Sequence, residues 1–157
     1  MTRPAITPPH MNPLNTAPTI TMRRLPDWPE RLAAHLHAAR ARPFCWGTHD
    51  CCTFAADAVH AITGWDYMAS LRARYFSGLQ AARVLREGGG LRQMVSDRMG
   101  PMVRATHATR GDVVVFDTQR NGEALGICVG AQFAAPAAWG LCLFDMNVAL
   151  AAWKVPA

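Results

Sequence analysis

The hydrophobic period of this chain of 157 residues changes once, near Met102. Before that point, apolar residues recur at helical spacing, which predicts helices over residues 27–43, 51–63, 67–74, 78–86 and 91–100. After it, short apolar runs predict strands over residues 112–116, 123–130, 141–144 and 150–155. Asn121-Gly122 is typical of a hairpin turn. Helices followed by antiparallel strands predict an α+β fold, with N-terminal helices packed on a C-terminal antiparallel sheet.

The stretch Phe44–Phe54 (FCWGTHDCCTF) combines a turn, a helix start and two adjacent thiols. Asp50 is a favourable N-cap residue, so we expect a helix to begin at Cys51 and to end before Gly64. A thiol in the first turn of a helix is stabilised as thiolate by the helix dipole. Cys51 is therefore a candidate nucleophile, although free cysteines often serve only as small buried apolar residues.

Residues 1–25 differ from the rest of the chain because they carry five prolines and five threonines with no helical or strand period. This composition predicts an extended N-terminal arm, which becomes ordered by lying on another subunit or by wrapping its own domain. Residues 26–157 then form a single domain, which is long enough to bury a core.

Net charge is +5, and arginine supplies fifteen of the sixteen basic residues. The arginines are spread over the predicted helices rather than clustered with aromatic residues, so we do not expect nucleic-acid binding. We also expect no membrane span and no signal-peptide segment, because no apolar run is long enough or suitably placed.

Five cysteines at positions 45, 51, 52, 128 and 142 do not form a secreted disulfide framework. They contain no CxxC pair, so a metal site would need ligands gathered from distant parts of the chain. We expect neither a metal nor a cofactor.

Three segments resemble the NlpC-type cysteine peptidases of the papain-like superfamily: residues 46–54 (WGTHDCCTF), 110–116 (RGDVVVF) and 125–127 (LGI). The resemblance covers roughly residues 26–155, and it is strongest to short phage-encoded relatives found among tail genes of siphophage-like viruses and gene transfer agents. It implies a papain-like NlpC-type fold. It also implies that Cys51 stands at the position of the nucleophile that cleaves peptide cross-links of bacterial cell walls.

The same resemblance places Ala124 where the family carries its catalytic histidine. Alanine cannot transfer a proton, and losing one member of such a catalytic unit removes most of the acceleration. His49 and His107 are the remaining candidate bases, and both also fit ordinary loop histidines.

Two functions follow from the resemblance. The first is a structural component of a phage tail tip or baseplate, made in the host cytoplasm and present in the virion, whose arm (residues 1–25) contacts other tail proteins. The alternative is a tail-associated cysteine endopeptidase that degrades host peptidoglycan during DNA entry. A third reading, an arginine-bearing module for nucleic acid or metal, has less support in the residues. The sequence leaves open whether the chain is an enzyme.

Overall fold

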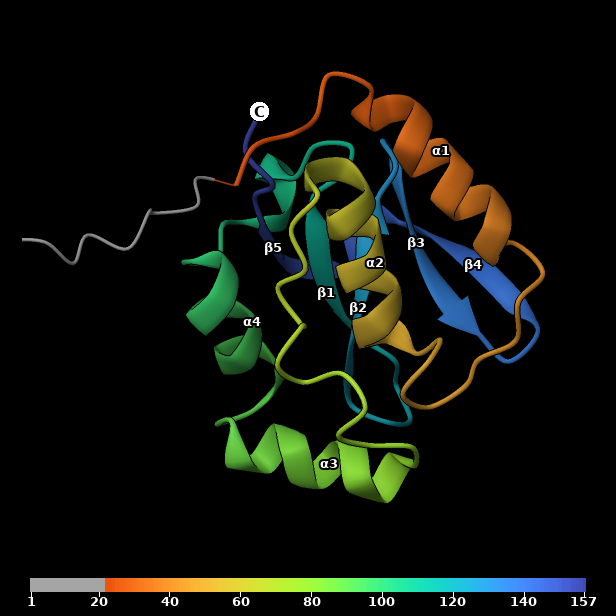
Figure 1. Cartoon of the computed structure of the whole chain (residues 1–157), viewed down its shortest axis with the longest axis vertical. Helices are drawn as coiled ribbons and strands as arrows, with labels where there is room; N and C mark the ends of the chain where they lie inside the picture. The colour runs from red at the N-terminus through yellow and green to blue at the C-terminus, as the bar shows by residue number, and fades with distance from the viewer. Residues whose placement is uncertain (1–21) are drawn as a thin grey trace, which may run out of the picture.

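A five-stranded antiparallel sheet forms one layer of the computed structural model, which describes residues 22–157 (Figure 1). The strand order is β4-β3-β2-β1-β5. The strands are β1 (Val113–Asp117), β2 (Glu123–Cys128), β3 (Gln132–Ala137), β4 (Gly140–Asp145) and β5 (Ala149–Trp153). Two short 3-10 turns, η1 (Ala105–His107) and η2 (Met146–Val148), precede β1 and β5.

The helices form the second layer, and all four precede the sheet in the chain. They are α1 (Trp28–Ala39), α2 (Cys51–Thr63), α3 (Gly78–Glu87) and α4 (Leu91–Met99). Helix α2 lies across the sheet with α1 beside it, whereas α3 lies beyond the end at which α2 begins (Figure 1). The α+β fold with helices packed on a C-terminal antiparallel sheet is confirmed.

Helix α2 is the centre of the core because small and apolar side chains cover most of its surface. Seven of its thirteen residues are buried. Phe54 and Ile62 are fully buried, and each contributes roughly 1.5–3 kcal/mol by leaving water. Gly64 ends the helix in the left-handed conformation, as the sequence predicts.

Alternate residues of β1 and β2 face two apolar clusters. Val113, Val115 and Leu125 point toward the helices, whereas Phe116 and Ala124 belong to a cluster on the other face with Phe133 and Phe144. Cys51 packs against both clusters. Cys51, the first residue of α2, therefore contacts apolar side chains of both clusters.

Two predictions about secondary structure were wrong. Residues 67–74 form consecutive turns rather than a helix, and Arg72 fixes them by ion pairs with Asp66 and Asp57, both at 2.6 Å. Strand β3 was not predicted, because Pro136 is unfavourable in a strand. Pro136 is tolerated because no strand hydrogen bond needs its missing N–H. Its partner Leu141 donates to the Arg40 carbonyl rather than to β3, and β2 pairs with β3 only at Phe133 and Ala134.

The predicted arm falls mostly outside the described residues, since the structure describes the chain only from Met22. Arg24 and Leu25 lie on the domain: the Arg24 N–H donates to the Pro156 carbonyl, and the Leu25 N–H donates to the Ile62 carbonyl. The described part of the chain therefore begins beside the C-terminal end of α2.

Candidate functional site

A tight turn delivers the chain to the start of α2. Cys45 and His49 exchange two backbone hydrogen bonds of 2.8 and 3.0 Å around it. Gly47 has a φ of +82°, and a Cβ atom there would lie 2.2 Å from the Tyr75 carbonyl oxygen. Only glycine fits this position, because any side chain would meet both strain and the backbone of the 67–75 segment.

Asp50 caps the helix as the sequence predicts. Its carboxylate accepts from the N–H of Thr53 at 2.9 Å and from the N–H of Gly47 at 2.8 Å. The Thr53 hydroxyl oxygen accepts from the N–H of Asp50 in return, which completes a capping box. The fully buried carboxylate thus joins the turn to the helix and fixes the direction of Cys51.

Cys51 and Cys52 are half-buried, and their sulfur atoms are 3.9 Å apart. The hydrogen bond between the thiols lowers the pKa of Cys51; burial opposes this, and a backbone hydrogen bond at Leu125 adds to the lowering. The same thiol contact raises the pKa of Cys52 well above its ordinary value, and burial adds to it. Of the two, Cys51 is therefore the more readily ionised thiol.

Two hollows meet at Cys51. The larger is a groove of about 540 Å³ between the 44–46 stretch, the β1–β2 hairpin and the end of β3. The smaller is a mostly apolar cavity of about 160 Å³ under α3. Trp46, Asn121 and Glu123 line both. Arg92 of α4 holds Glu123 through bonds of 2.6 and 2.9 Å to its two carboxylate oxygens, which fixes the groove wall.

Ala124 lines the same groove as Cys51, on the strand that follows the hairpin. It pairs with Phe116 across β1 and β2, and it is almost fully buried. Among the described residues that line either hollow there is no histidine. At position 124 the groove that contains Cys51 is therefore lined by a methyl group.

His49 does not line either hollow, although it is only two residues from Cys51. Its side chain is buried against the Phe54 ring at a centroid distance of 6.1 Å, and its Nε2 atom finds no hydrogen-bond partner within residues 22–157. Burial lowers the pKa of His49, and positive charge on Arg42 and His35 lowers it further. His49 therefore packs in the core as a neutral ring.

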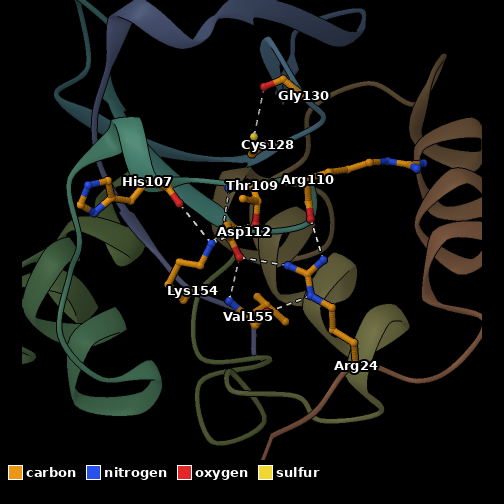
Figure 2. Close-up of polar contacts among 9 residues, drawn as sticks. All are labelled: Arg24, His107, Thr109, Arg110, Asp112, Cys128, Gly130, Lys154 and Val155. Atoms are coloured by element: carbon orange, nitrogen blue, oxygen red, sulfur yellow. Dashed lines mark hydrogen bonds and ion pairs between the residues drawn. The ribbon is translucent and has the colours of Figure 1, made fainter. Parts of the chain in front are cut away.

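His107 lies at the opposite end of α2. Its carbonyl accepts from Lys154 Nζ at 3.1 Å, and Lys154 also pairs with the buried Asp112. Gly111 next to Asp112 packs on Ile62, and Ile62 is about 16 Å along the helix from Cys51. Figure 2 shows the His107 ring pointing away from Asp112. The structure therefore does not bring this candidate base to the thiol.

Asp112 follows Gly111 in the segment 110–116 (RGDVVVF), and its carboxylate joins several chain segments near the C-terminal end of α2 (Figure 2). It is fully buried and accepts hydrogen bonds from Arg24, Lys154, the Val155 N–H, and both the N–H and the hydroxyl of Thr109. The carboxylate therefore joins Arg24 to the residues that follow β5. Its hydrogen bonds are all made at this end of the domain, away from Cys51.

Sequence reasoning missed two tyrosines near the thiols. Tyr67 and Tyr75 are both buried, and burial followed by negative charge on Cys52 raises the pKa of each. The Tyr67 hydroxyl has no hydrogen-bond partner among the described residues. Both tyrosines lie outside helices and strands, where no hydrophobic periodicity indicates which side chains are buried. Their position near the thiols therefore follows only from the three-dimensional structure.

Within residues 22–157 the structure gathers no group of three or more His, Cys, Asp or Glu side chains suited to a metal ion. Cys45 and Cys142 are exposed, and Cys128 is buried on β2. In that same part of the chain, none of the helices has the length and apolar character needed to cross a membrane.

Comparison with solved structures finds the fold in the NlpC/p60 domain of the peptidoglycan hydrolase SagA. That crystal structure aligns with a TM-score of 0.53 at 16% sequence identity, over 80% of this chain and 97% of the SagA domain chain. No curated protein matches the chain. A family model, described as a domain of unknown function, matches residues 23–155. The chain therefore belongs to the DUF6950 family and has an NlpC/p60-like fold.

Proposed function

We propose that this chain is a structural component of a phage tail tip or baseplate, with an NlpC-type fold that has lost hydrolysis. The observation that carries the loss of hydrolysis is the groove at Cys51. Ala124 stands in it beside the thiol, and no described lining residue is a histidine.

The missing base matters because peptide hydrolysis needs proton transfer twice. A positioned base accepts the thiol proton and returns it to the leaving amine, and later activates the water that releases the acyl group. A positioned acid or base contributes about 10²- to 10⁴-fold to such steps. Neither His49, buried on Phe54, nor His107, at the far end of α2, stands where it could do so.

The location in a phage tail rests on the resemblance of residues 46–54, 110–116 and 125–127 to phage-encoded relatives. The arm, residues 1–25, is the segment that would contact neighbouring tail proteins. Its described residues Arg24 and Leu25 are anchored to Asp112 and to the carbonyls of Pro156 and Ile62, at the opposite end of α2 from Cys51.

One observation favours a second function, a tail-associated cysteine endopeptidase acting on host peptidoglycan. The Cys51 thiol lies in an open groove at a helix N-terminus, and its pKa is lowered. A base supplied by a partner chain would complete such a site.

Digestion of purified peptidoglycan separates the two functions. The wild-type chain and Cys51→Ala are incubated with sacculi, and released fragments are identified by mass spectrometry. We expect equal, background release from both proteins. Fragments that appear only with the wild-type chain would overturn the loss of hydrolysis and support the endopeptidase.

The tail location is tested separately on purified phage particles encoded by the same genome. Quantitative mass spectrometry should find the chain at a fixed ratio to a tail-tube protein. Deletion of residues 1–21, which keeps Arg24 on Asp112 and Leu25 on Ile62, should remove it from the particles. Particles that lack the full-length chain would contradict the structural role.

A further inference from the structure

The cavity under α3 has the size and lining of a site for a small apolar group. Its volume is about 160 Å³, and its walls include Met68, Leu71, Leu85, Leu91 and Met94. An apolar cavity of roughly 150 Å³ holds one benzene ring. The cavity beside Cys51 therefore accommodates an apolar group of about six carbon atoms.

A buried hydroxyl without a partner adjoins this cavity. Tyr67 is 4% exposed, and its hydroxyl has no partner among the described residues. It lines a small space of about 20 Å³, bounded also by Cys52 and by several cavity residues, which is room for one water-sized group. Burial raises the pKa of Tyr67, and negative charge on Cys52 and then on Cys51 raises it further. A ligand with one oxygen acceptor beside an apolar body matches these features.

We propose that Cys51 is an acyl-acceptor site, which takes an apolar acyl group of about six carbons from a thioester or another activated ester. The Cys51 thiolate attacks the carbonyl carbon and forms a new carbon–sulfur bond. The bond from that carbon to the leaving thiolate or alkoxide breaks, and the leaving group departs with the electron pair and takes a proton from solvent. The acyl chain lies in the cavity, and its carbonyl oxygen accepts from Tyr67.

Without a proton-transferring side chain beside Cys51, only acyl donors whose leaving group departs unprotonated can react with the thiolate. A thiolate or activated alkoxide leaves without protonation, whereas the amine of a peptide needs an acid to leave. The same absence makes the product persist, because water is a very weak acid and needs a base to attack the thioester. This persistence rests on the proposed loss of hydrolysis; the acylation itself does not.

The test uses p-nitrophenyl esters of acetic, hexanoic and dodecanoic acid, and a hexanoyl thioester, with the full chain. We expect a burst of about one equivalent of p-nitrophenol, and an intact-mass adduct mapped to Cys51. Hexanoyl transfer should be roughly tenfold or more faster than acetyl transfer, because four further methylenes become buried. Dodecanoyl transfer should be slower than hexanoyl, because its chain exceeds the cavity.

Matched variants identify the site. Cys51→Ala should form no adduct, and Cys52→Ala should keep it. Ala82, exposed at the cavity mouth, allows a filling variant: Ala82→Phe should slow hexanoyl but not acetyl transfer. Arg83→Phe, on the same helix but outside the cavity lining, should change neither. Tyr67→Phe should slow acyl transfer and leave alkylation of Cys51 by iodoacetamide unchanged.

The outcomes separate this inference from the loss of hydrolysis. If iodoacetamide labels Cys51 but no ester acylates it, or if the rate depends neither on chain length nor on Ala82→Phe, the acyl-acceptor site is overturned alone. If p-nitrophenol release continues steadily after the burst and depends on Cys51, the thioester is being hydrolysed. That result would overturn both its persistence and the proposed loss of hydrolysis.

Discussion

Replacing Asp112 by alanine should weaken the fold far more than replacing an exposed charged side chain. The carboxylate is fully buried and pairs with Arg24, whose side chain is 9% exposed, and with Lys154. Its loss leaves Arg24 without its carboxylate and the buried N–H of Val155 without an acceptor. Breaking a buried ion pair costs about 3–5 kcal/mol, and an unpaired buried N–H about 1–3 kcal/mol. Because these effects share one carboxylate, we expect a total of about 3–5 kcal/mol rather than their sum.

Denaturant unfolding followed by tryptophan fluorescence measures this loss, since Trp153 on β5 is fully buried. Hydrogen exchange should show faster exchange at the amides of Arg24 and Val155, because both lie at the bonds that the carboxylate organises. Asp27→Asn is the matched control, since Asp27 is exposed and, in the described part of the chain, forms an ion pair only with Arg31. It should leave the midpoint nearly unchanged. A loss below about 1 kcal/mol for Asp112→Ala would refute the reasoning from burial.

Two further perturbations test the turn and the histidines around α2. Gly47→Ala should cost about 1–3 kcal/mol or more, because a Cβ would meet the Tyr75 carbonyl; Gly122→Ala, at φ +79° with nothing within 4 Å, should cost less in the same unfolding assay. Burial lowers the pKa of His35 and His49 below 6.5, so the unfolded chain binds protons first as the pH falls. The free energy of unfolding should therefore be fully retained above pH 6.5 and decrease below it. Equal unfolding midpoints at pH 7.5 and 5.5 would contradict this.

Local sequence signals predicted the parts of the fold that depend on neighbouring residues. The start of α2 follows from Asp50, whose carboxylate needs only the N–H groups of the next turn. Its end follows from Gly64, and the β1–β2 hairpin from Asn121-Gly122. Strand β3 could not be predicted in this way, because Pro136 is tolerated only where neither neighbouring strand needs its missing N–H, and that depends on how β2 and β4 pair with β3.

In the candidate site, too, some features depend on neighbouring residues and others on residues far apart in the sequence. Cys51 at the first position of a helix could be predicted locally, and the structure places it in one groove with Ala124. The positions of the two histidines could not. His49 is turned away by packing on Phe54, and His107 is separated from Cys51 by nearly the full length of α2. The position of His49 is set by its packing on Phe54, and that of His107 by which loop lies at the far end of α2. Neither depends on neighbouring residues alone.

The absence of an imidazole beside Cys51 is the central claim, and the pH dependence of Cys51 alkylation tests it most directly. The rate constant with iodoacetamide is measured from pH 5 to 9 in Cys52→Ala and in the same chain with Ala124→His added. We predict that the rate in Cys52→Ala rises continuously through one thiol titration, and that the added histidine accelerates alkylation near neutral pH, because an imidazolium stabilises the thiolate. A fast rate that is already independent of pH below about 7 without the added histidine would show a thiolate–imidazolium pair, and would contradict the account.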